Sequence, residues 1–110
     1  MAENNPLPVK WSSVAKNRLV EVYEYIESKT SINIAEKVTL ELADAAESTR
    51  KNPFLFSECK ELSTKTKAYR NIIKWNYRII YKITSDYILI LDIFHCKRNP
   101  KELKKLRRIH

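Results

Sequence analysis

The sequence predicts an α+β domain in which a helical hairpin packs on a mostly antiparallel four-stranded sheet, in the order β-α-α-β-β-β, followed by a short C-terminal helix. In the first half of the chain, apolar residues recur with the spacing of a helix face, and in the second half runs rich in Ile, Tyr and Leu take over. Helices that are separated along the chain from strands are typical of a two-layer domain. A length of 110 residues suits a single domain over residues 1–110.

A short strand and a helix are expected at the N-terminus. The strand covers Leu7–Ser12, and Pro8 restricts it to a sheet edge or to a strand start, because proline cannot donate a hydrogen bond to a neighbouring strand. Ser12 or Ser13 then caps the helix. The apolar face of this helix consists of Ala15, Leu19, Val22, Tyr23 and Ile26.

A second helix is expected after a break at residues 28–33. Asn33 and Glu36 have the spacing of a capping box, in which each side chain accepts from a backbone N–H group at the start of a helix. The helix ends at residues 51–53, because the residue before Pro53 avoids the helical conformation. Its apolar face consists of Ala35, Val38, Leu42 and Ala45. Two helices with a short break between them form an antiparallel hairpin.

Three further strands are expected after an irregular connection over residues 53–67. The strands cover Tyr69–Lys74, Tyr77–Thr84 and Tyr87–Phe94. Two-residue connections between them predict consecutive hairpins, whose turns favour glycine. The chain has no glycine, so Asn76 and Asp86 are the residues best able to adopt a positive φ. Asn99 and Pro100 then begin the short basic C-terminal helix.

Alternation along the middle of these strands predicts which face of the sheet the helices cover. The side chains on the covered face are Tyr77, Ile79, Tyr81 and Ile83. The other face presents Arg78 and Lys82, joined by Arg70 and Lys74 if the register places them on that side. This face is either a basic binding surface or an ordinary solvated one. Arg78 is expected either to pair with a carboxylate such as Asp92 or to receive an anion.

Positive charge is concentrated in the second half of the chain. Residues 1–59 have seven Lys/Arg against nine Asp/Glu, a net charge of −2, whereas residues 60–110 have fourteen against four, a net charge of +10. Such asymmetry is typical of proteins that bind a phosphate-rich partner, and it also suits an acidic protein partner.

His95, Lys97 and Arg98 follow the last strand and could support RNA cleavage. In that reaction a 2′-hydroxyl loses a proton and the leaving 5′-oxygen gains one, and a histidine can act as the general acid or base. The two cations would stabilise the negative charge of the transition state. The alternative is a histidine that makes a structural hydrogen bond.

The sequence offers no ligand set for a metal and no loop for a nucleotide cofactor. Cys59 and Cys96 are too few for a disulfide framework or a paired-cysteine zinc site, and both are expected to be buried or half-buried thiols. Without glycine there is no Gly-rich phosphate loop. No apolar run approaches the roughly 18 residues of a membrane span. The N-terminus has no signal-peptide pattern, so a cytoplasmic location without membrane contact is expected.

Four segments along the chain resemble one protein family. They are V-K-W-S-S-x-A-x-x-x-L-x-x-x-Y-x-Y-I at residues 9–26, Y-R-x-I-x-K at 69–74, N-Y-R-I-I-Y-K-I at 76–83 and I-L-I-L-D-I-F-H-x-x-R-N-P at 88–100. In order and spacing they are similar to the RelE/ParE superfamily of toxins from type II toxin–antitoxin systems. The resemblance implies the β-α-α-β-β-β core, a cognate acidic antitoxin encoded nearby and no small-molecule cofactor.

The resemblance leaves two activities open. RelE-like members cut mRNA on the ribosome, whereas ParE-like members poison DNA gyrase without chemistry of their own. The residues at positions that the nucleases use are Arg70, Arg78, His95, Lys97 and Arg98. A tyrosine that some nucleases carry near the C-terminus is missing from residues 101–110. The helical hairpin and the H-x-x-R-N-P ending resemble the ParE-like branch more closely.

The expected function is therefore that of a toxin that arrests growth by inhibiting DNA gyrase, in the context of plasmid stabilisation. The alternatives are a metal-independent, ribosome-dependent mRNA endoribonuclease, and a non-toxic RNA-binding module or decayed toxin. Target-binding residues are expected to be Arg70, Lys74, Arg78, Lys82, Lys97 and Arg98. For a ribonuclease, the catalytic residues are expected to be Arg70, Arg78 and His95.

Overall fold

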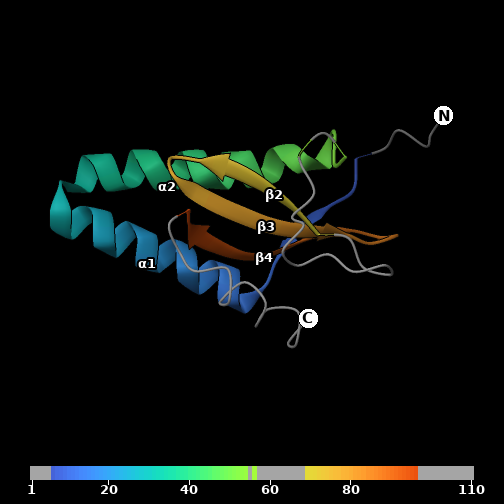
Figure 1. The fold of residues 1–110 in the computed structure, drawn as a ribbon, viewed down its shortest axis with the longest axis horizontal. Coiled ribbons are helices and arrows are strands. Elements are labelled where there is room, and N and C mark those ends of the chain that lie inside the picture. Colours follow the sequence, from blue (N-terminus) through green and yellow to red (C-terminus); the bar gives the residue numbers. More distant parts are fainter. Residues whose placement is uncertain (1–5, 55, 57–68, 97–110) are drawn as a thin grey trace.

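Two helices lie side by side on one face of a four-stranded sheet (Figure 1). This computed structural model describes residues 6–54, 56 and 69–96. The helices are α1 (Ser13–Lys29) and α2 (Ile32–Glu47), and a 3₁₀ turn, η2 (Ser48–Arg50), follows α2. The strands are β1 (Val9–Trp11), β2 (Tyr69–Lys74), β3 (Tyr77–Ile83) and β4 (Ile88–His95). The predicted α+β architecture is confirmed, while the expected C-terminal helix lies outside the described residues.

The strands are ordered β1-β4-β3-β2 across the sheet. β2, β3 and β4 form an antiparallel meander, and β1 runs parallel to β4 beside Ile88–Ile90. The sheet is therefore mostly antiparallel, and β1 lies at the edge that Pro8 predicts. In the part of the chain that the structure describes, neither helix is both long and apolar enough to cross a membrane.

Both helices begin at a serine cap. The Ala15 N–H donates to Ser12 Oγ over 3.0 Å, which confirms one of the two caps predicted for α1. At α2 the Ile34 N–H donates to Ser31 Oγ over 3.2 Å, so the cap lies two residues before the predicted cap at Asn33. Residues 48–50 leave the α-helical geometry earlier than predicted, because the 3₁₀ turn tightens the chain ahead of Pro53.

The two hairpin turns differ from each other. Trp75 and Asn76 form a two-residue turn in which both residues are left-handed, with φ angles of 56° and 63°. The prediction for Asn76 is confirmed, whereas Trp75 was not expected to take this conformation. The β3–β4 connection spans residues 84–87, and the Tyr87 N–H donates to Thr84 Oγ1 over 2.9 Å. Because this side chain closes the turn, Asp86 does not adopt the expected positive φ.

A β-bulge changes the side-chain pattern of β4. Ile80 of β3 pairs with Asp92, and the next residue, Tyr81, pairs with Ile90, so that Leu91 is an extra residue in β4. A bulge of this kind bends the strand and redirects nearby side chains. Leu91 and Asp92 are both buried, although they are neighbours in a strand.

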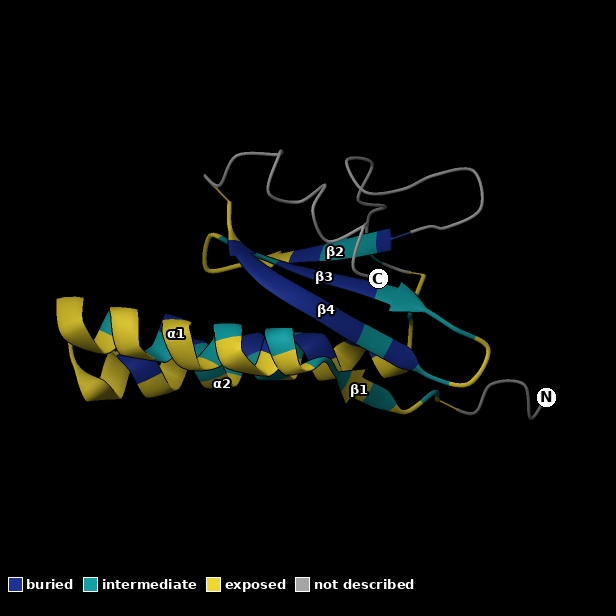
Figure 2. Ribbon diagram, turned by 90° about the horizontal axis from the view of Figure 1, so that it is seen from below, coloured by how far each residue is buried: buried dark blue, intermediate teal, exposed yellow. Residues whose placement is uncertain are grey.

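The sheet carries an apolar cluster on each face. The cluster against the helices includes Ile79 and Tyr81, with Tyr77 and Ile83 packed beside it, and this confirms the predicted orientation of β3. A smaller cluster on the opposite face consists of Tyr69, Ile80, Leu91 and Phe94, all of them buried. Most of β4 is buried, since it contributes to both clusters (Figure 2).

Candidate functional site

The register of the β2–β3 hairpin separates the four cations of the predicted basic face. Arg70 pairs with Tyr81 and Lys74 with Tyr77, and directly paired residues share a face of the sheet. Arg70 and Lys74 therefore lie on the helix side, whereas Arg78 and Lys82 lie on the opposite side. The expectation that all four would share one surface is wrong.

Arg70 is engaged by the backbone that follows the 3₁₀ turn. Its Nη1 atom donates to the carbonyl oxygen of Phe56 over 2.6 Å and to that of Phe54 over 3.3 Å, and its guanidinium lies 5.0 Å from the centre of the Phe54 ring. The neighbouring Tyr81 hydroxyl donates to the Pro53 carbonyl over 2.7 Å. Arg70 and Tyr81 together fix the backbone of Pro53, Phe54 and Phe56 against the sheet.

Burial of the Tyr81 hydroxyl raises its pKa to about 12, and the positive charge of Arg70 only partly opposes this shift. A neutral hydroxyl can donate to a carbonyl, whereas a phenolate cannot. The raised pKa therefore keeps the hydrogen bond to Pro53 intact over the usual pH range.

Arg78 and Lys82 remain together on the sheet face that the helices do not cover. Both are half-buried, and they flank the buried Ile80 on β3. Their partners across the strand pair are Phe94, which is buried, and Leu89, which is half-buried, so the two cations stand beside apolar side chains. This pair is what the structure retains of the predicted basic face.

The carboxylate of Asp92 is bound by α1. Arg18 Nε donates to Asp92 Oδ1 over 3.0 Å, and the Ile93 N–H donates to the same oxygen over 2.7 Å. Burial disfavours the charge of Arg18, but the carboxylates of Asp92 and Glu21 outweigh it and raise the pKa of the guanidinium. Asp92 thus forms an ion pair with Arg18, a residue that the sequence analysis did not single out.

His95 is exposed at the end of β4, on the helix side of the sheet. It pairs with Tyr77, and the two rings meet edge to face with their centres 5.3 Å apart. His95 lines a groove of about 380 Å3. The other residues that line this groove are Arg18, Glu21, Val22, Tyr25, Tyr77 and Ile93.

The structure does not bring the expected nuclease residues together. Arg78 projects from the sheet face opposite to His95. Arg70 lies on the same face as His95, but it pairs with Tyr81, which is four residues along β3 from Tyr77, the residue that pairs with His95. Lys97 and Arg98 lie outside the described residues. Cys96 is an exposed free thiol rather than a buried one, and Cys59 also lies outside the described residues.

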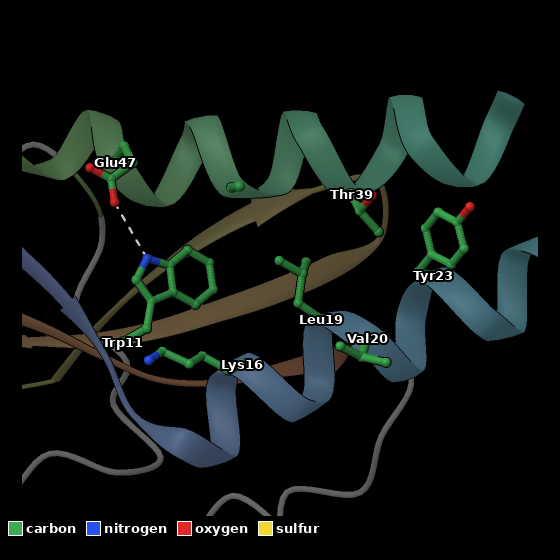
Figure 3. A pocket seen from close by; sticks show the side chains of 8 residues that line it. Trp11, Lys16, Leu19, Val20, Tyr23, Thr39 and Glu47 are labelled. Atoms are coloured by element: carbon green, nitrogen blue, oxygen red, sulfur yellow. Dashed lines mark hydrogen bonds between the residues drawn. The ribbon is translucent and has the colours of Figure 1, made fainter. Parts of the chain in front are cut away.

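A larger apolar groove lies between α1 and α2, on the side away from the sheet (Figure 3). It has a volume of about 540 Å3. The residues that line it are Trp11, Lys16, Leu19, Val20, Tyr23, Thr39, Ala43 and Glu47. At one end, Trp11 Nε1 donates to Glu47 Oε2 over 3.3 Å. Sequence reasoning missed this groove, although Val20, which is 56% exposed, lies outside the predicted apolar face of α1.

Comparison with known proteins agrees with the observed fold. A family model described as the ParE toxin of type II toxin-antitoxin system, parDE, matches residues 9–100. Among solved structures, the chain is similar to one from the chromosomal ParDE TA system from P. aeruginosa, with a TM-score of 0.71. The two share 14% sequence identity, and the match covers 84% of this chain and 99% of that chain. No curated protein matches the sequence.

Proposed function

Because this chain belongs to the family of ParE toxins of type II toxin–antitoxin systems, we propose that it arrests growth by inhibiting DNA gyrase. One observation carries the choice of mechanism. Arg78 and His95, which a ribonuclease would need at one phosphate, project from opposite faces of the sheet. A protein that acts by binding alone needs no such cluster.

The target-binding surface proposed for this activity is the sheet face of Arg78 and Lys82. Both cations are half-buried and so partly accessible, and positive charge in a protein–protein interface orients an oppositely charged partner. Arg70 is less suited to this role, since its guanidinium already donates to the carbonyls of Phe54 and Phe56.

A purified gyrase assay tests the mechanism. With the protein in excess, supercoiling should fall and DNA breaks should accumulate in complex with gyrase. The control is the same protein with Arg78→Ala, in whose presence gyrase should supercoil DNA as fast as it does without any added protein. Undiminished supercoiling at a large excess of the folded wild-type chain would refute gyrase inhibition.

Cleavage of mRNA on the ribosome is the second candidate, and the exposed position of His95 beside Tyr77 favours it. It is tested on programmed ribosomes, where a ribonuclease leaves shortened mRNA with defined ends. Intact mRNA together with trapped gyrase–DNA breaks would decide for gyrase. If neither product appears and growth is unimpaired, the chain is a decayed toxin or a non-toxic RNA-binding module.

A ParDE-type toxin implies an antitoxin partner. We propose that an acidic segment of the antitoxin binds the Arg78 and Lys82 face, because opposite charges favour this pairing and because covering the target-binding face would explain neutralisation. Co-expression with the neighbouring small gene should then restore growth. Complex formation should weaken at high salt, since the interface depends on charge.

A further inference from the structure

The turn between β2 and β3 holds a tryptophan in a conformation that a large side chain normally avoids. Trp75 and Asn76 have φ angles of 56° and 63°. Two-residue turns with both residues left-handed favour Asn-Gly or Asp-Gly, because a side chain at positive φ crowds its own backbone. Bulky residues at such positions are uncommon, and they concentrate at sites where function maintains them.

Two residues of α2, one helical turn apart, fix the orientation of the indole ring. Trp75 Nε1 donates to Glu41 Oε1 over 3.0 Å, and the Lys37 ammonium lies 5.7 Å from the ring centre. Lys74 Nζ is 3.7 Å from the same Glu41 oxygen. Despite these contacts Trp75 remains 46% exposed, so packing against α2 does not account for the choice of a tryptophan.

The surroundings of Trp75 are cationic. Lys37 lies near the ring itself, and Lys74 lies on the helix side of the sheet next to Trp75 in the chain. Among these charged neighbours only Glu41 is negative. Its ion pair with Lys74 is exposed on both sides, at 46% and 37%, and such pairs are weak enough for the lysine to change partner.

A fixed, exposed aromatic ring among lysines is the chemistry that binds single-stranded nucleic acids. Unpaired bases stack on the ring, and the neighbouring cations receive the phosphates. An apolar protein segment would need a wider apolar surface than one indole and Ile73. An acidic peptide would use the cations but would gain little from a strained tryptophan.

We propose that Trp75 is a stacking platform for an unpaired base of single-stranded nucleic acid, with Lys37 and Lys74 receiving the adjacent phosphates. This site lies on the helix side of the sheet, apart from the face of Arg78 and Lys82. It therefore goes beyond the inhibition of gyrase and stands independently of it.

Tryptophan fluorescence of the full chain provides a direct measurement. The sequence contains two tryptophans, and Trp11 lies in the groove between the helices, so Trp11→Phe leaves Trp75 as the sole reporter. Titration with oligothymidylate and with oligouridylate should quench this signal to saturation, and added salt should weaken binding. The two oligomers distinguish DNA from RNA. An unquenched signal with both oligomers at low salt would overturn the proposal.

Two substitutions separate binding from strain. Trp75→Asn should reduce affinity for a labelled oligonucleotide by about tenfold or more while the midpoint of thermal unfolding stays equal or rises. Asn76→Gly, the matched control, should also raise that midpoint but leave affinity unchanged. A Trp75→Asn variant that loses thermal stability and retains affinity would make Trp75 a structural residue and defeat the proposal. Equally tight binding of a duplex of the same length would exclude stacking of unpaired bases.

Discussion

Arg18 and Asp92 join the first helix to the last strand of the sheet through a bond between Nε and Oδ1 of 3.0 Å. Asp92 is 1% exposed, and the Arg18 side chain, 32% exposed, also lies over the Phe94 ring with its guanidinium 5.9 Å from the ring centre. The pair anchors α1 beside the bulge in β4.

Replacement of Arg18 should destabilise the fold. Because Arg18→Ala removes an ion-pair partner of a buried carboxylate, we expect a loss of about 2–4 kcal/mol in the free energy of unfolding, less than for a fully buried pair. Urea denaturation measures this loss. Glu21→Gln is the control, since it weakens only the exposed ion pair between Arg18 and Glu21 and should cost less than about 0.5 kcal/mol. Equal stability of the two variants would contradict a structural role for the Arg18–Asp92 pair.

Alkaline pH should weaken the fold through Tyr81. In the unfolded chain this hydroxyl ionises near its ordinary pKa of about 10, whereas in the folded chain its pKa is about 12. The stabilising effect is therefore complete below pH 10 and is lost as pH rises towards 12. Thermal unfolding followed between these limits should show a falling midpoint. Tyr81→Phe should show a smaller decline, and an unchanged decline would assign the effect to other groups.

Removal of Arg78 should abolish growth arrest without unfolding the protein. Arg78 is half-buried, so Arg78→Ala should change stability by less than about 1 kcal/mol if its role is to bind the target. Arg78→Lys should restore little activity, since an ammonium cannot replace the planar guanidinium. Growth assays and thermal denaturation are read together, and Lys51→Ala, at an exposed position, controls for the loss of one positive charge. Full toxicity of a stable Arg78→Ala variant would remove this residue from the site.

Arg70 should behave in the opposite way. Arg70→Ala removes two hydrogen bonds to the carbonyls of Phe54 and Phe56 and should cost about 1–3 kcal/mol of stability. Activity per folded molecule should remain close to that of the wild type. Soluble protein quantified beside the growth phenotype makes the comparison. Loss of toxicity at unchanged stability would restore Arg70 to the target-binding surface.

Substitution of His95 distinguishes inhibition from RNA cleavage. His95→Gln keeps hydrogen-bonding groups but cannot serve as a general acid or base. Growth arrest should therefore persist if the protein inhibits gyrase by binding. A loss of arrest by several orders of magnitude in the folded variant would instead indicate chemistry at His95.

The helices and strands could be predicted because each depends on local pattern. β2 has the expected bounds, and the alternation along β3 correctly placed Ile79 and Tyr81 against the helices. The pairing of Arg70 can also be predicted from the sequence, since a two-residue turn after Lys74 places Arg70 opposite Tyr81.

Other features depended on contacts that no local pattern contains. Arg18 and Asp92 are 74 residues apart in the chain, so only the folded structure pairs them. At the start of α2, Ser31 and Asn33 are both suitable caps, and local preference does not choose between them. The left-handed Trp75 opposes its own preference, and for this reason sequence reasoning overlooked it.

The hydrogen bonds of Ser12 join the first helix to a strand that is synthesised near the end of the chain. Its N–H donates to the Ile90 carbonyl over 2.9 Å and its hydroxyl to the Leu91 carbonyl over 2.8 Å, across a separation of 79 residues for the second bond. The start of α1 is thus completed by a strand that the ribosome makes much later, and β4 also separates β1 from the rest of the sheet. Contacts this distant in sequence form only after the intervening chain has been translated. A nascent chain that stops before residue 88 lacks a central strand and should be harmless to the cell that is making it.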